Sequence, residues 1–146
     1  MSNLPIQHDD SDIETVSLCV WKEARGEGQL GMKGVLDVIC NRARDWRKSL
    51  HDVVYGKNQF TSMSVSSDPE FNLYPVDGDE QFKYATEITS QILETGMGDI
   101  TMGAHYYANL KEVTSGWFSQ HISGPDGNGT PEHRFTTQIG RHKFYV

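Results

Sequence analysis

Two helical hydrophobic patterns, joined by a glycine-rich turn, constrain the fold of this chain more than any other feature. Ser11 and Glu14 have the spacing of a capping box, so we expect the first helix to begin near Asp12. Its apolar residues are Ile13, Val16 and Val20. The second pattern follows Gly26, Gly28 and Gly31, and its apolar residues are Met32, Val35, Leu36, Ile39 and Ala43. Two such helices are expected to form a rigid corner at the edge of the core.

Glu23 continues the apolar stripe of the first helix close to Gly26, where that helix is expected to end. A carboxyl group in this position should be partly desolvated, which raises its pKa. A glutamic acid that keeps its proton near neutral pH can act as a general acid. The alternative is that Glu23 and Glu27 are solvated carboxylates at a frayed helix end, with Lys22 and Arg25 as surface partners.

The segment Trp21-Lys22-Glu23-Ala24-Arg25-Gly26-Glu27 resembles the first motif of the SleB/CwlJ cell-wall hydrolase family. This family includes spore-cortex lytic enzymes and phage endolysins. Further similar blocks follow in the same order, at Gly31, Val35, Val38, Asn41 and Arg42 and in residues 54–61, 104–109, 114–118 and 139–145. The resemblance therefore covers nearly the whole chain after residue 12. It implies a lysozyme-like fold, cleavage of peptidoglycan glycan strands between N-acetylmuramic acid and N-acetylglucosamine, and Glu23 as the catalytic acid.

Several further residues become candidate substrate contacts through the resemblance. Gln59, Phe60 and Thr61 match the family's block that lines the sugar subsites near the acid. If residues 104–109 form a strand, Tyr106 and Tyr107 point to opposite faces, and we expect Tyr106 in the cleft and Tyr107 in the core.

Asn109 belongs to the same group as the two tyrosines. Trp117 and Phe118 could stack on sugar rings, and core packing is the alternative for both.

A second carboxylate is less well defined. Glu27 lies four residues after Glu23, a spacing of about 6 Å between Cβ atoms in a helix. It could therefore act in the chemistry or hold the turn by binding backbone amides or Arg25. Lytic transglycosylases of the family use a single Glu, whereas a hydrolase would need a positioned water and a further acid. Candidates for that acid are Asp37, Asp45, Asp68 and Asp77.

The sequence predicts no metal and no cofactor. Its six histidines are scattered, and neither H-E-x-x-H nor C-x-x-C is present. Cys19 and Cys40 fall in the two predicted helices, where thiols serve more often as small apolar core residues than as a disulfide. Two other function classes stay open: a zinc-dependent N-acetylmuramoyl-L-alanine amidase and a non-catalytic peptidoglycan-binding protein.

The 146 residues are enough for one domain, which we place at residues 11–146 after a polar N-terminal arm at residues 1–10. The expected fold class is α+β, mainly helical, with a small β hairpin around Gly140. Residues 56–78 should form an ordered loop along the cleft, followed by a helix from Asp77 or Asp79 to about Glu94.

The net charge of −7 argues against a nucleic-acid partner. No secretory signal or membrane-spanning segment is predicted. We therefore expect a monomeric protein made in a host cytoplasm. The single-domain phage endolysins are the most similar family members, so a holin would be needed for access to peptidoglycan.

Overall fold

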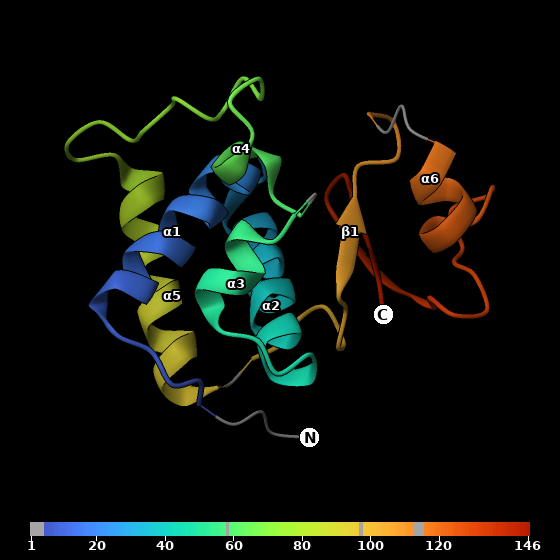
Figure 1. The fold of residues 1–146 in the computed structure, drawn as a ribbon, viewed down its shortest axis with the longest axis horizontal. Coiled ribbons are helices and arrows are strands. Elements are labelled where there is room, and N and C mark those ends of the chain that lie inside the picture. The colour runs from blue at the N-terminus through green and yellow to red at the C-terminus, as the bar shows by residue number, and fades with distance from the viewer. Residues whose placement is uncertain (1–4, 58, 97, 113–115) are drawn as a thin grey trace.

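The computed structural model describes residues 5–57, 59–96, 98–112 and 116–146. Most of its helices gather on one side of the molecule, and its strands lie on the other side together with the helical segment of residues 116–123 (Figure 1). The helical elements are α1 (Asp10–Ala24), η1 (Arg25–Glu27), α2 (Gly28–Asp45), α3 (Leu50–Tyr55), α4 (Thr61–Ser64), α5 (Glu80–Thr95), α6 (Gly116–Phe118) and η2 (Ser119–Ser123). The strands are β1 (Tyr106–Ala108), β2 (Phe135–Ile139) and β3 (His142–Tyr145). The expected mainly helical α+β fold is confirmed.

The first helix begins two residues earlier than expected. Asp9 is its N-cap, and the backbone N–H of Asp12 donates to the Asp9 carboxylate while the Asp9 N–H donates to Asp12. The capping box predicted at Ser11 and Glu14 is therefore wrong, because an acidic pair with the same spacing lies two residues upstream. The polar arm is also partly attached to the domain, since the Ile6 N–H donates to the Leu93 carbonyl.

The main core lies where α1, α2, α3 and α5 meet. Its fully buried members include Val16, Cys19, Val20, Val35, Leu36, Ile39, Cys40, Val54 and Leu93. Both cysteines are free thiols inside this core, as predicted. Burial of such apolar side chains stabilises a fold by about 1.5–3 kcal/mol each. The core fixes α1 against α2, and with it the turn that follows Glu23.

The sheet is antiparallel with the strand order β1-β3-β2. The β2–β3 hairpin turns at Gly140, as predicted, and Tyr107 of β1 lies opposite Phe144 of β3. Phe144 is fully buried against Val38 of α2. Gly34 allows this close packing, because a Cβ atom there would lie 2.8 Å from the Phe144 ring. The sheet is thus held against the same helix that packs on α1.

The long segment between α3 and α5 is held by two cations, Lys22 of α1 and Arg25 of η1. Lys22 is only 6% exposed, and its Nζ donates to the carbonyls of Phe71, at 2.7 Å, and Ser62, at 3.3 Å. Arg25 makes a two-pronged ion pair with Glu70. The alternative reading of Lys22 and Arg25 as surface partners of nearby carboxylates is therefore wrong, because both hold the loop that forms one wall of the cleft.

Among the described residues, no helix has the length and apolar character that would be needed to cross a bilayer. Asn58, Thr114 and Ser115, which belong to two of the blocks that resemble the family, lie outside the described residues.

Candidate active site

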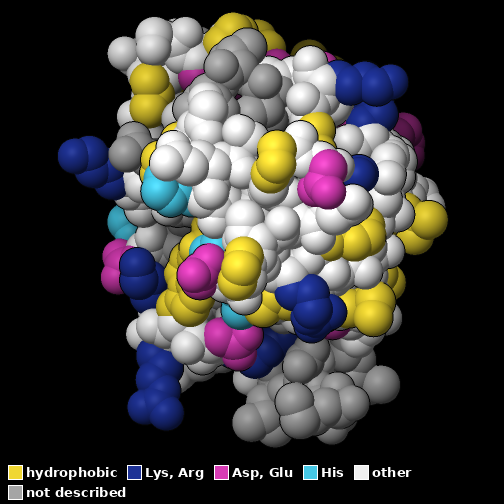
Figure 2. All heavy atoms as spheres, turned by 90° about the vertical axis from the view of Figure 1, so that its right-hand side faces the viewer, with side chains coloured by type: hydrophobic (Ala, Val, Ile, Leu, Met, Phe, Trp, Pro, Cys, Tyr) yellow, Lys and Arg dark blue, Asp and Glu magenta, His cyan; other side chains and the backbone are white. Residues whose placement is uncertain are grey.

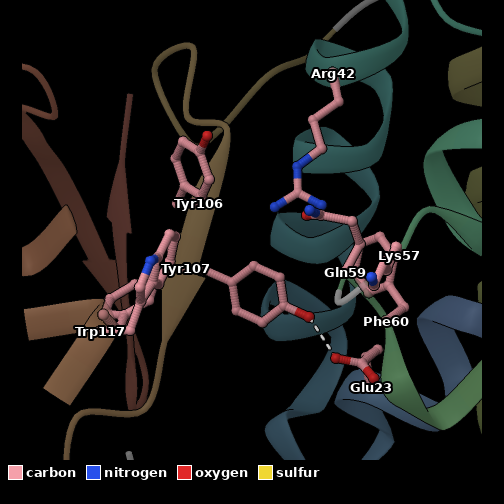
Figure 3. Close-up of a pocket in the computed structure, with 9 residues that line it drawn as sticks. Glu23, Arg42, Lys57, Gln59, Phe60, Tyr106, Tyr107 and Trp117 are labelled. Atoms are coloured by element: carbon pink, nitrogen blue, oxygen red, sulfur yellow. Dashed lines mark hydrogen bonds between the residues drawn. The ribbon is translucent and has the colours of Figure 1, made fainter. Parts of the chain in front are cut away.

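A cavity of about 660 Å³ opens between the helices and the sheet. Its lining comes from five segments that are distant in the sequence, and consists of Glu23, Arg42, Lys57, Gln59, Phe60, Tyr106, Tyr107, Trp117 and Phe118. Figure 3 shows the aromatic residues of β1 and α6 on one side and the residues of α1, α2 and the α3–α4 loop on the other. Of the residues predicted from the sequence, Glu23, Gln59, Phe60, Tyr106 and Trp117 all reach this cavity.

Glu23 lies at the end of the cavity with both carboxyl oxygens engaged. The Tyr107 hydroxyl donates to Oε1 at 2.7 Å, and the Ser62 hydroxyl donates to Oε2 at 2.6 Å. Ser62 is itself buried in α4, so its hydroxyl has a fixed position. These two contacts hold the carboxyl group in one orientation at the cavity wall, as a general acid requires.

Burial raises the pKa of Glu23 above its ordinary value. The negative charges of Asp68 and Glu70 act in the same direction, whereas the hydrogen bonds from Ser62 and Tyr107 lower the pKa by stabilising the carboxylate. Desolvation is the largest of these effects, so Glu23 keeps its proton to a higher pH than an ordinary glutamic acid does. The predicted raised pKa is thus supported by the environment that the fold provides.

Tyr107 corrects one prediction from the sequence. Its ring packs against the core and against Phe144, as expected, but its hydroxyl reaches across the cleft to Glu23. Burial raises the pKa of the Tyr107 phenol, which keeps the hydroxyl protonated as a hydrogen-bond donor. The assignment of Tyr107 to the core alone is therefore wrong, because a long side chain can pack with its ring and still place its hydroxyl in the site.

The other predicted contacts lie at different places. Trp117 is 57% exposed at the cavity mouth and stacks near His121. Thr61 does not border the cavity. Its hydroxyl donates to the carboxylate of Asp68 in an exposed hydrogen bond. Asn109 borders a second, smaller cavity of about 310 Å³.

The second cavity lies on the other side of Glu23 and is strongly charged. It is lined by Lys22, Glu23, Arg25, Gly26, Glu27, Glu70, Asn109, Glu112, Arg141 and His142. Glu23 borders both cavities, and we refer to the two as the arms of one cleft. An extended chain of sugars lying in the cleft would pass over Glu23.

Sequence comparison identifies the family. The pattern that describes the cell wall hydrolase family matches residues 26–145, which is most of the chain. The chain belongs to this family. The match begins after Glu23, so the role of that residue is argued from its geometry.

Individual relatives agree with this assignment. The chain is 31% identical over 119 residues to a spore cortex-lytic enzyme of Halalkalibacterium halodurans. The alignment covers 80% of this chain and 32% of the relative, so the chain spans about a third of that protein's length.

Two solved structures share the fold. The catalytic domain of the germination-specific lytic transglycosylase SleB from Bacillus anthracis has a TM-score of 0.70 and 24% identity, with 98% of this chain and 100% of that chain covered. The catalytic domain of the Bacillus cereus SleB protein has a TM-score of 0.69 and 24% identity, with 100% and 98% covered. The expected lysozyme-like α+β fold is confirmed by these matches.

Glu27 has a partner that the sequence did not indicate. In this cell wall hydrolase it forms an ion pair with Arg141, at the turn of the β2–β3 hairpin, rather than with Arg25. The Arg141 contact lowers the pKa of Glu27, so this carboxyl group loses its proton at a lower pH than Glu23 does. Of the two roles considered for Glu27, holding the turn agrees with this contact.

The four aspartates considered as a further acid do not line the larger cavity. Asp37 is buried on α2 beside Lys33, Asp45 contacts His105, and Asp68 accepts from Thr61. Asp77 belongs to the turn before α5. In the described part of the chain, no group of three or more His, Cys, Asp or Glu side chains is placed to hold a metal ion.

Proposed function

We propose that this cell wall hydrolase cleaves the glycan strand of peptidoglycan between N-acetylmuramic acid and N-acetylglucosamine, as a lytic transglycosylase. The supporting observation is that Glu23 is the one carboxyl group among the described residues that lines the larger cavity. Its pKa is raised and both its oxygens are held by hydroxyl groups. A lone, oriented carboxyl group with a raised pKa suits a reaction that uses one residue first as acid and then as base.

The proposed reaction has two steps. Glu23 first donates its proton to the glycosidic oxygen, the bond to the anomeric carbon breaks, and the N-acetylglucosamine side leaves as an alcohol. The Glu23 carboxylate then removes the proton of the muramyl 6-hydroxyl, whose oxygen bonds to the anomeric carbon and closes a 1,6-anhydro ring. The Ser62 and Tyr107 hydroxyls stabilise the carboxylate that exists between the steps, because both donate to it.

A muramidase reaction is the alternative within the same site. In that case a water replaces the 6-hydroxyl, and a second carboxylate must activate it. Glu27, Glu70 and Glu112 line the smaller cavity with Glu23. Two of these three, Glu70 and Glu27, are paired with arginines, which makes them poor candidates for the base that hydrolysis would need.

The test is mass spectrometry of the soluble fragments that the protein releases from purified Gram-negative peptidoglycan. Wild type, Glu23→Gln and the control Glu94→Gln are compared, since Glu94 is an exposed carboxylate on α5. We expect anhydro-muramyl ends from wild type and from the control, and none from Glu23→Gln with an unchanged circular dichroism spectrum. The amide is nearly isosteric but cannot donate the proton.

Other outcomes separate the alternatives. Reducing muramic ends would establish a muramidase. Intact glycan chains with freed peptides would indicate an amidase, and loss of that activity with a chelator would identify a metal enzyme. Binding to peptidoglycan without fragments would indicate a non-catalytic binding protein, and fragments from a well-folded Glu23→Gln protein would remove Glu23 from the mechanism.

The predicted biological setting stays a prediction. In this setting the protein is a phage endolysin that stays in the host cytoplasm, and it reaches the cell wall after a holin opens the membrane. Expression in a Gram-negative host with and without a holin, followed by culture turbidity, tests it. We expect lysis only when both proteins are present.

A further inference from the structure

Arg42 is a buried cation at the wall of the larger cavity. Only 5% of the residue is exposed, and its Nε donates to the carbonyl of His105 at 2.7 Å. The guanidinium lies over three aromatic rings, those of Trp46, Phe60 and Tyr106, at 5.2, 5.3 and 5.4 Å from the ring centroids. In Figure 3 the Arg42 side chain extends from α2, and its guanidinium lies between Tyr106 and the pair Gln59 and Phe60.

The guanidinium is incompletely satisfied. Its Nη1 is buried and has no hydrogen-bond acceptor. The faces of aromatic rings attract a cation, but they offer no hydrogen-bond acceptor to the N–H groups in the plane of the guanidinium. A buried charge that lacks a partner is destabilising, and an anion that binds to it removes this penalty. The position of Arg42 at the cavity therefore indicates a ligand that brings an oxygen acceptor.

A second cation borders the same cavity. Lys57 precedes α4 and lies beside Gln59 and Phe60 in the lining. Within the described chain, neither Arg42 nor Lys57 has a carboxylate within ion-pair distance. Glu23 is the single carboxyl group of the described lining, so the two cations outnumber it. This arm of the cleft is thus locally positive in a protein whose net charge is −7.

The other arm of the cleft has a different electrostatic character. Of its lysine and arginine side chains, two are paired with carboxylates, Arg25 with Glu70 and Arg141 with Glu27. The third, Lys22, donates to two backbone carbonyls. Figure 2 shows that on the face of the molecule at the sheet and α6, basic and acidic side chains are scattered among uncharged ones. An anionic ligand is therefore favoured in the larger cavity rather than in the smaller one or on this face.

We propose that Arg42 and Lys57 form a binding site for a carboxylate of the muramyl unit. The carboxylate is either the free lactyl group of an unsubstituted muramic acid or the first carboxylate of the attached stem peptide. The proposal deepens the proposed function and depends on it. The muramyl unit then lies in the larger cavity and the neutral N-acetylglucosamine in the smaller one, which fixes the direction of the glycan strand across Glu23.

The test is calorimetric binding of soluble glycan fragments to the Glu23→Gln protein, in which binding is measured without cleavage. Three probes of similar length are used: muramyl glycan with stem peptides, the same glycan after an amidase has removed the peptides, and neutral chitohexaose. Lys57→Gln is the main variant, because Lys57 lies in a loop and its loss should not affect folding. Lys83→Gln on α5 makes the same charge change outside the cleft. Arg42→Lys, which keeps the charge but not the fork, is a further variant.

We expect the carboxylate-bearing probes to bind about tenfold more tightly than chitohexaose, as one charge-assisted hydrogen bond allows. Lys57→Gln should remove most of this preference and leave chitohexaose binding unchanged, whereas Lys83→Gln should change neither. A loss only with the peptide-bearing probe assigns the stem carboxylate, and a loss that includes the peptide-free probe assigns the lactyl group.

Two results would overturn the proposal. Equal binding of all three probes, or an equal loss for all three in Lys57→Gln, would mean that the cations serve the fold or the sugar rings alone. In that case wild type would still release anhydro-muramyl fragments, so the proposed function would survive. If no probe binds and wild type releases no fragments, both proposals are wrong.

Discussion

The hydroxyl of Tyr107 donates a hydrogen bond of 2.7 Å to Oε1 of Glu23, although 84 positions separate the two residues in the sequence. The contact joins the sheet to the helical part of the molecule at the point where the chemistry is proposed. It also has a defined electrostatic effect. Because the hydroxyl donates to the carboxylate, it stabilises the charged form and opposes the effect of burial on the Glu23 pKa.

Replacing Tyr107 by Phe should therefore have two effects on glycan cleavage. The rate constant kcat should fall about tenfold, the size expected for one lost hydrogen bond to a charged group. The pKa of Glu23 should rise further, so the alkaline limb of the kcat/KM profile should move to higher pH. A pH–rate profile of solubilised peptidoglycan fragments measures both effects.

Tyr106→Phe is the matched control for Tyr107→Phe. Tyr106 is adjacent on β1, lines the same cavity and makes no hydrogen bond to Glu23 among the described contacts. Its removal should leave the alkaline limb in place, whatever its effect on KM. If Tyr107→Phe also left the limb in place, the hydrogen bond would have no influence on the proton that Glu23 transfers.

Gly31→Ala tests how the turn after Glu23 is held. A Cβ atom at Gly31 would lie 2.4 Å from the Cβ of Glu27, so Glu27 must move away from Arg141. Alanine favours a helix by about 1 kcal/mol over glycine, but we expect the clash to win and lower the free energy of unfolding by about 1–3 kcal/mol. Urea denaturation measures this change. Gly26→Ala is the control, because no atom lies within 4 Å of the added carbon. A Gly31→Ala protein more stable than wild type would contradict the account.

Local features of the fold could be predicted from the sequence because they depend on residues close together in the chain. The periodic apolar residues predicted α1 and α2. Asp79, one of the two caps considered, is the N-cap of α5, and the hairpin turns at Gly140. The capping box failed for an equally local reason, because Asp9 and Asp12 offer the same spacing as Ser11 and Glu14.

The contacts that complete the site could not be predicted, because packing brings together distant residues. Ser62 reaches Glu23 across 39 positions, and Arg141 reaches Glu27 across 114. Ser62 directly follows the block of Gln59, Phe60 and Thr61 that resembles the family, so the signal pointed to the correct segment but not to the correct side chain. A single serine leaves no repeating pattern in the sequence, so nothing there distinguishes a hydroxyl that contacts Glu23 from one at the surface.

Gly34→Ala should separate the sheet from α2. The added carbon would lie 2.8 Å from Cζ of Phe144, which is fully buried and has no room to move. Since Phe144 lies opposite Tyr107 in the sheet, the displacement should also lengthen the Tyr107–Glu23 contact. We expect a loss of about 1–3 kcal/mol in the free energy of unfolding together with a lower kcat. Unchanged stability and unchanged kcat would show that the sheet packs less tightly on α2 than described.

Asp37 gives the domain a pH-dependent stability that is separate from catalysis. The side chain is 3% exposed, lies 3.1 Å from Lys33 Nζ and accepts from the Ile100 N–H at 2.9 Å. Burial outweighs these contacts and raises the pKa of Asp37 from 3.8 to about 6. A folded-state pKa above the unfolded one means that the folded protein binds the proton more tightly. The stabilising contribution is thus complete below pH 3.8 and is lost as the pH rises through about 6.

Asp37→Asn removes this titration while nearly preserving the shape of the side chain. The two pKa values differ by about two pH units, which corresponds to roughly 3 kcal/mol. We therefore expect the stability of wild type, measured relative to Asp37→Asn, to fall by roughly this amount between pH 4 and pH 7. Urea denaturation of both proteins at several pH values in this range measures the difference, and every other titrating group cancels in it. A difference that stays constant with pH, or that grows as the pH rises, would show that the Lys33 contact and not burial determines the charge of Asp37.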